Sequence, residues 1–165
     1  MSKPQYLNYG LTLKKQVLNE AHNASLAHTR LVRRIEHLVE NLPVDIKTIP
    51  MDFSHSEFSQ WFASRSMKFK KIPQLRDYVT KIEYLTHQLE VMYENIYLIY
   101  AQKKARQWFR PLLTLAYQRV SSTQHGYAQH TFENFTTLSD ELIEVLNKLE
   151  NHLAIQPNEN LLILL

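Results

Sequence analysis

The chain has 165 residues, which is enough for one domain with a sizeable hydrophobic core. Apolar residues make up 44% of the sequence and charged residues 21%, a globular composition that excludes global disorder. Two glycines are too few for the many tight turns of a sheet-rich fold, so the composition favours long helices.

The charge and cysteine content exclude several classes of function. The formal net charge is +3, and its basic residues form short clusters without a nucleic-acid-binding motif, so we expect no nucleic-acid partner. The absence of cysteine excludes disulfides, thiolate nucleophiles and thiol redox switching. No signal-peptide core and no run of about 18 apolar residues is present, so we expect a cytoplasmic protein without a membrane span.

Apolar residues recur every three or four positions from about Thr12 to Asn41, which predicts a first long amphipathic helix. Thr12 is the candidate N-cap, and Pro43 closes the helix because the residue before a proline disfavours helical geometry. His28 falls on the apolar stripe of this helix, so we expect its imidazole to lie inside the fold.

The connection that follows contains prolines and serines, which indicate irregular structure. Within it, the stretch "HSEFSQWF" predicts a short helix that is anchored by three aromatic residues, Phe58, Trp61 and Phe62. Ser54 or Ser56 is the expected N-cap of this short helix.

The second half of the chain is also predicted to be helical. A helix from about Gln74 continues or breaks near "AQKKA", and a further helical segment reaches Val120 with a kink or start at Pro111. The stretch "SSTQHG" predicts a break before a last helix over residues 127–153, and the helical pattern ends at Pro157. We therefore predict an all-α fold, most simply an antiparallel four-helix bundle with an additional C-terminal helix.

One row of side chains on the helix after Gln74 suggests a site. Val79, Glu83, His87 and Val91 lie four residues apart, which predicts that they share one strip of the helix surface. Glu83 and His87 could present two donors to a metal ion, with His28 facing them from the first helix. The alternative, which the spacing alone favours, is a buried ion pair of Glu83 with His28 or His87 and no metal.

Three stretches together resemble the chemoreceptor zinc-binding domain family over roughly residues 12–121. The stretch "AHTRLV" places His28 in a context like the first motif of the family. "SEFSQWF" resembles the second motif, with Ser56 where the family has cysteine. "EYLTH" resembles the third, with His87 at the second histidine and Glu83 in place of the first.

The resemblance implies a sensory four-helix bundle, often a homodimer, that regulates chemoreceptors or diguanylate cyclases. It implies zinc at His28, Glu83 and His87, with Ser56, His55 or water as the fourth ligand. A serine hydroxyl is a poor zinc ligand compared with a thiolate, and the oxidation chemistry of the cysteine is lost. The resemblance predicts about one zinc ion per chain, lost when His28 or His87 is replaced by alanine.

The C-terminal end "DELIEVLNKLENHLAIQPNENLLILL" has a weaker resemblance to the start of a GGDEF domain. Asp140, Leu142, Asn147 and Lys148 align with that start, and "LLILL" would be its first strand. The alternative is an amphipathic last helix with an apolar tail. We accordingly divide the chain into a bundle of residues 1–121 and a C-terminal part of residues 122–165, either a separate unit or part of the same domain.

These patterns favour a non-enzymatic cytoplasmic sensory or regulatory module with an altered zinc site, acting as a homodimer or on a signalling partner. A metal-free adaptor that works through protein contacts is the alternative, as is the sensory part of a truncated diguanylate cyclase. A metal-dependent helical-bundle enzyme is a third hypothesis, although no separate general base is identifiable in the sequence.

Overall fold

The computed structural model describes residues 3–108 and 122–161, and the regular structure in these ranges is entirely helical. This confirms the predicted all-α class. The α-helices are α1 (Lys3–Val39), α2 (Glu57–Phe69), α3 (Arg76–Trp108), α4 (Ser122–Ile155) and α5 (Asn158–Leu161). Short 3-10 helices in the connections are η1 (Ile46–Thr48), η2 (Phe53–His55) and η3 (Pro73–Leu75).

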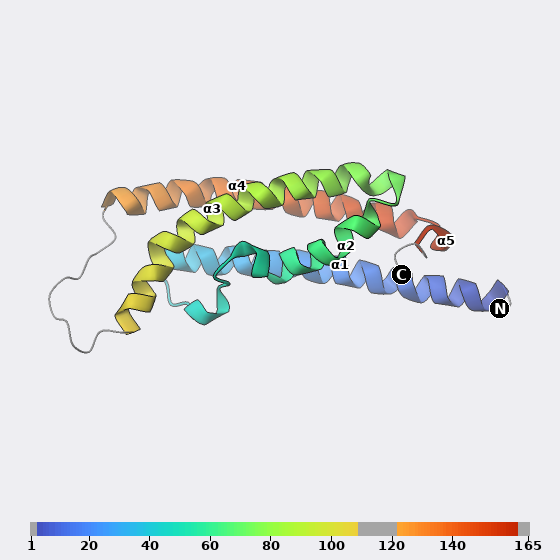
Figure 1. Ribbon diagram of the computed structural model, residues 1–165, viewed down its shortest axis with the longest axis horizontal. Helices are drawn as coiled ribbons and strands as arrows, with labels where there is room; N and C mark the ends of the chain where they lie inside the picture. The colour runs from blue at the N-terminus through green and yellow to red at the C-terminus, as the bar shows by residue number, and fades with distance from the viewer. Residues whose placement is uncertain (1–2, 109–121, 162–165) are drawn as a thin grey trace.

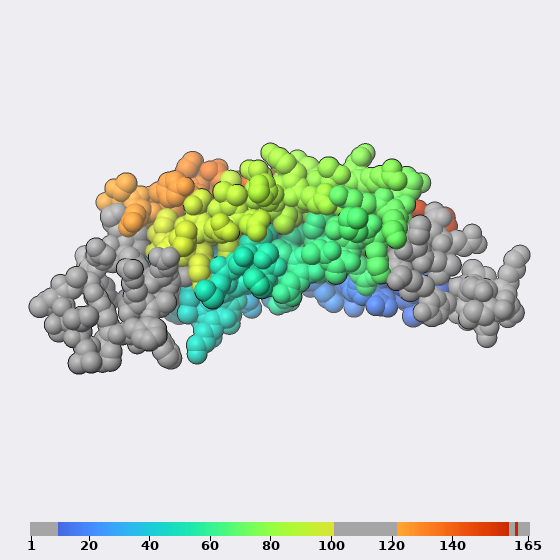
Figure 2. All heavy atoms as spheres, in the orientation of Figure 1, coloured from blue at the N-terminus to red at the C-terminus, as the bar shows by residue number. Residues whose placement is uncertain are grey.

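The long helices lie along the long axis of the molecule, and successive helices run in alternate directions (Figure 1). Helix α4 packs against both α1 and α3, while the shorter α2 covers part of α1. Side chains of α3 form much of the upper part of the face shown in Figure 2. No helix in the described ranges combines the length and the apolar character that a bilayer crossing requires.

Helix α1 differs from the prediction at its start and confirms it near its end. It begins at Lys3, so Thr12 lies inside the helix and the predicted N-cap is wrong. The regular helix ends at Val39, and Asn41 adopts a left-handed φ of 56°. The N–H of Leu42 donates to the carbonyl of His37 at 2.8 Å, the bond of a Schellman motif, in which asparagine tolerates the left-handed residue.

Helix α2 is longer than the predicted short helix, but its N-cap is one of the two expected. The hydroxyl of Ser56 accepts a hydrogen bond from the backbone N–H of Ser59, so Ser56 is the cap. Ser54 instead lies in η2, where its own N–H donates to the Asp52 carboxylate. Phe53, which the sequence pattern does not single out, is fully buried beside the start of α2.

The predicted break at "SSTQHG" is wrong, because α4 already begins at Ser122. Gly126 is helical and exposed, with no neighbouring side chain near it, so it costs the helix only about 1 kcal/mol relative to alanine. Packing of the rest of α4 outweighs that cost. Helix α3 runs unbroken through "AQKKA" to Trp108, and the predicted segment around Pro111 lies outside the described residues.

The described residues of the C-terminal part pack against the other helices of the chain. The aligned stretch from Asp140 to Lys148 lies within the continuous helix α4, which contacts α1 and α3. The chain leaves α4 near Pro157 as predicted, and Leu161 is buried in the helix α5 rather than in a strand. Residues 162–165 of the predicted strand lie outside the described residues.

The core lies between the inner faces of α1, α3 and α4, and the aromatic residues of η2 and α2 close one side. The largest fully buried side chains are Tyr93, Phe53, Phe58, Phe69, Phe135, Ile35, Leu38, Leu75, Ile82, Leu85, Leu89 and Ile96. His28 shares this core with them, a polar side chain among apolar ones.

Candidate functional site

His28 of α1 lies inside this core, as the sequence pattern predicts. Its side chain has no exposed surface, and its ring packs against three phenylalanines from different elements. The ring centroid of His28 lies 6.1 Å from that of Phe53, 5.4 Å from that of Phe58 and 6.5 Å from that of Phe135. The imidazole is therefore held by η2, α2 and α4 together.

The hydrogen-bonding capacity of the two ring nitrogens of His28 is unused. Neither Nδ1 nor Nε2 has a hydrogen-bond partner, although buried polar atoms nearly always have one. Burial lowers the pKa of His28 from 6.5 to about 4, because the apolar surroundings disfavour the charged imidazolium. At neutral pH the ring is uncharged and offers one donor and one acceptor.

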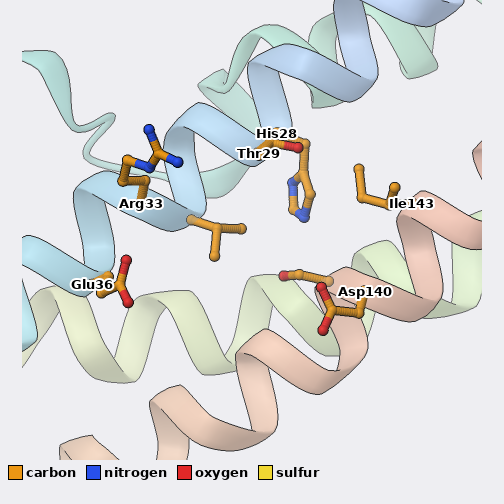
Figure 3. Close-up of a pocket in the computed structure, with 8 residues that line it drawn as sticks. His28, Thr29, Arg33, Glu36, Asp140 and Ile143 are labelled. Carbon is orange, nitrogen blue, oxygen red and sulfur yellow. The ribbon is translucent and has the colours of Figure 1, made fainter.

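A pocket of about 170 Å³ adjoins His28 between α1 and α4. In Figure 3 the imidazole points from α1 toward α4, where Asp140 and Ile143 lie. Residues of α1 (His28, Thr29, Val32, Arg33 and Glu36) and of α4 (Ser139, Asp140 and Ile143) line it. The hydroxyl of Ser139 is buried and, like the nitrogens of His28, has no hydrogen-bond partner.

Glu83 does not lie in this core. Its carboxylate forms a salt bridge with the ammonium group of Lys70 at 2.7 Å, and 41% of the Glu83 side chain is exposed. The alternative of a buried ion pair between Glu83 and a histidine is therefore wrong, because the carboxylate has a lysine partner near the surface.

His87 lies still further out, with 71% of its side chain exposed and its Nδ1 3.9 Å from a carboxylate oxygen of Glu90. The prediction that the row from Val79 to Val91 shares one strip of the helix surface is wrong, because each step of four residues advances about 40° beyond a full helical turn. Over three such steps the row drifts from Val79, which is fully buried, to Val91, which is half-exposed. His87 falls on the outer part of this drift.

The two candidates for a fourth ligand also have other positions. The hydroxyl of Ser56 is buried and caps α2, where it also donates to the hydroxyl of Ser59 at 2.9 Å. His55 is exposed in η2, with its Nδ1 3.5 Å from the hydroxyl of Ser54. Ser56 thus has a structural role that needs no metal.

The donors predicted for zinc do not fit one ion in this arrangement. Throughout the described ranges, no three His, Cys, Asp or Glu side chains form a group that could hold a metal. A zinc site needs its ligands within about 2.0–2.3 Å of one point, whereas His28 is buried and His87 faces outward. Zinc binding consequently stays a prediction of the family resemblance.

The capping role of Ser56 can be tested directly. Replacing Ser56 with alanine should lower the free energy of unfolding by about 1 kcal/mol, because the N–H of Ser59 loses its acceptor. Urea denaturation should show this loss equally with and without added zinc. The matched Ser54→Ala variant should change stability far less, and a loss that needs zinc would contradict the capping role.

Ser139 and its neighbour Asp140 line the pocket although neither was predicted as a pocket residue. Ser139 follows Phe135 by four residues and precedes Leu142 by three, so it lies on the buried stripe of α4. A polar residue on an apolar stripe is the same signal that singled out His28. Asp140 carried no such signal, because it is exposed at the rim.

Comparisons of the chain with protein-family models, with curated proteins and with solved structures gave no match.

Proposed function

We propose that the chain is a non-enzymatic cytoplasmic regulatory module, an antiparallel four-helix bundle with α5 added, that acts through protein contacts. One observation carries this proposal. Tyr84, Val91 and Leu98 lie on the outside of α3 at seven-residue spacing, with 56%, 50% and 53% of their surface exposed. Apolar residues repeated every seven positions are typical of the seam between two associating helices.

The residues between these positions favour a second copy of the chain as the first partner. His87 and Glu94 are exposed and lie three residues after Tyr84 and Val91, so they complete the same outer row. In an antiparallel pairing of two α3 helices centred on Val91, Tyr84 faces the partner's Leu98 and His87 faces the partner's Asn95, one residue from Glu94. This pairing joins apolar with apolar side chains and places each histidine opposite an asparagine amide, beside the carboxylate of Glu94.

The buried site supports a role other than catalysis. Within the described residues, the nitrogens of His28 contact no carboxylate or hydroxyl that could act with them as a base or a nucleophile. A regulatory module needs a surface that binds a partner protein. It also needs an input, such as a ligand, that shifts the equilibrium between its conformations. The outer row on α3 supplies the first, and the family resemblance implies a signalling protein as a further partner.

Self-association through α3 gives a direct test. The wild-type protein should be a dimer by size-exclusion chromatography with light scattering, and Val91→Glu should be a monomer because it buries an unpaired charge at the centre of the seam. Met67→Glu is the matched control, since Met67 is 71% exposed on α2 and should leave the dimer intact. A wild-type monomer at high micromolar concentration, or a dimeric Val91→Glu, would contradict the proposal.

Zinc sensing is the second candidate function. It is favoured by the two ring nitrogens of His28, which have no hydrogen-bond partner. If the chain senses zinc, the purified protein should retain about one zinc ion per chain after incubation with zinc and desalting. If it acts through protein contacts alone, it should retain well below one, because Glu83 and His87 lie near the surface. Elemental analysis of the wild type and of His28→Ala, Glu83→Ala and His87→Ala measures this. One zinc per chain, lost in the His28 and His87 variants alike, would instead establish the site that the resemblance implies.

A further inference from the structure

The pocket between α1 and α4 has a polar floor. Its deepest residues, His28 and Ser139, are 0% and 2% exposed, and neither side chain has a hydrogen-bond partner. A buried polar group without a partner keeps the cost of its lost hydration, so a molecule that satisfies these groups gains affinity from them. The neutral imidazole and the hydroxyl can each donate and accept one hydrogen bond.

The size and the walls of the pocket restrict what could bind there. A volume of about 170 Å³ is close to that of a cavity which holds benzene, so a ligand of about six to eight non-hydrogen atoms fits. Val32 and Ile143 form apolar walls on opposite helices, and the imidazole of His28 adds an aromatic surface that phenylalanine rings hold in place. These walls suit a flat ring better than a hydrated ion.

The rim of the pocket carries more negative than positive charge. Glu36 and Asp140 contribute two carboxylates and Arg33 contributes one guanidinium, which leaves a formal charge of −1. In Figure 3 the guanidinium of Arg33 lies away from the carboxylate of Asp140, which is on the α4 side beneath the imidazole. The rim therefore favours a cationic group beside Asp140.

We propose that this pocket binds a small organic cation, a heteroaromatic ring with an N–H donor and a nitrogen acceptor, joined to a protonated amine. The ring lies between Val32 and Ile143 and hydrogen-bonds His28 and Ser139, while the amine pairs with Asp140. The site lies between α1 and α4, away from the outer row on α3. The proposal of a ligand site therefore does not depend on whether the chain dimerises. As an input, it would act on the packing of α1 against α4.

Histamine is a suitable probe because it combines an imidazole with a short amine, and imidazole-4-acetate is its counterpart of opposite charge. Titration of the full chain by isothermal calorimetry should give saturable binding of histamine and at least about tenfold weaker binding of imidazole-4-acetate. Ser139→Ala should weaken histamine binding about five- to tenfold, because it removes one hydrogen bond at a buried site.

The variants at the exposed Asp140 and Asp77 keep this part of the test independent of folding. Asp140→Asn should weaken histamine binding severalfold and leave imidazole-4-acetate unchanged or tighter, since it removes one rim charge. The matched controls are Asp77→Asn, an exposed aspartate of α3, and Ser66→Ala, a buried serine of α2, and both should bind like the wild type. Equal binding of the two probes overturns the cation preference. No binding at millimolar probe by a folded wild type overturns the site and means that the pocket holds water only.

Discussion

The free energy of unfolding should fall by about 3 kcal/mol between pH 6.5 and pH 4 because of His28 alone. Burial lowers the pKa of His28 from 6.5 in the unfolded chain to about 4 in the folded one. In this window the unfolded chain binds a proton that the folded chain does not, so acid favours unfolding. The loss begins as the pH falls through 6.5 and levels off below about 4.

His28→Leu isolates this effect from the titration of other groups. Leucine is close in size and apolar, so the variant should be at least as stable as the wild type at neutral pH, where it removes two unpartnered nitrogens. Urea denaturation of both proteins across the window should show the difference growing as the pH falls. Arg33, Glu36 and Asp140 line the same pocket and are present in both proteins. Their contributions to the pH dependence therefore largely cancel when the two stabilities are subtracted. Parallel curves would contradict a buried neutral histidine.

Phe53→Ala should lower the free energy of unfolding by about 3–5 kcal/mol, the largest loss that we expect from a single truncation in a connecting segment. The ring of Phe53 is fully buried and packs against His28, Tyr93 and Phe135, which belong to α1, α3 and α4. The hydroxyl of Tyr93 also donates to the carbonyl of Pro50, which fixes the segment on α3. Removing the ring leaves a cavity where three helices meet.

Met51→Ala is the matched control for Phe53, because Met51 lies two residues earlier with 81% of its surface exposed. It should change the free energy of unfolding by less than about 0.5 kcal/mol. Thermal and urea denaturation of both variants give the comparison. A loss below about 1 kcal/mol in Phe53→Ala would mean that the segment before α2 can leave the core at little cost.

The helical class and the interior position of His28 could be predicted because both depend on local periodicity. The apolar spacing in α1 and α4 continues for many turns, so a single residue that departs from the pattern does not change the predicted helix. Helix ends were harder to predict. Thr12 has the chemistry of a cap and lies inside α1, and Gly126 has the chemistry of a break and lies inside α4, because continued packing overrides weak local signals.

The ligand set could not be predicted from spacing because a row of four-residue steps is not straight. It drifts around the helix, so Val79 and His87 fall on opposite sides of the boundary between core and surface. Spacing also contains no information about competing partners. Lys70, from the end of α2, pairs with Glu83, and that contact depends on how α2 and α3 meet.

The position of α5 has a consequence for the order of folding. A Cβ on Gly10 would lie 2.9 Å from that of Asn158, and the ammonium group of Lys14 donates to the carbonyl of Gln156 at 2.9 Å. These contacts join the beginning of the chain to its end, and a helix of four residues has no stability of its own in water. The pairing of α4 with α1 closes the long loop and brings α5 beside the start of α1, so α5 should dock only after α1 and α4 have assembled. A spectroscopic probe on α5 would therefore report the last step of folding rather than the first.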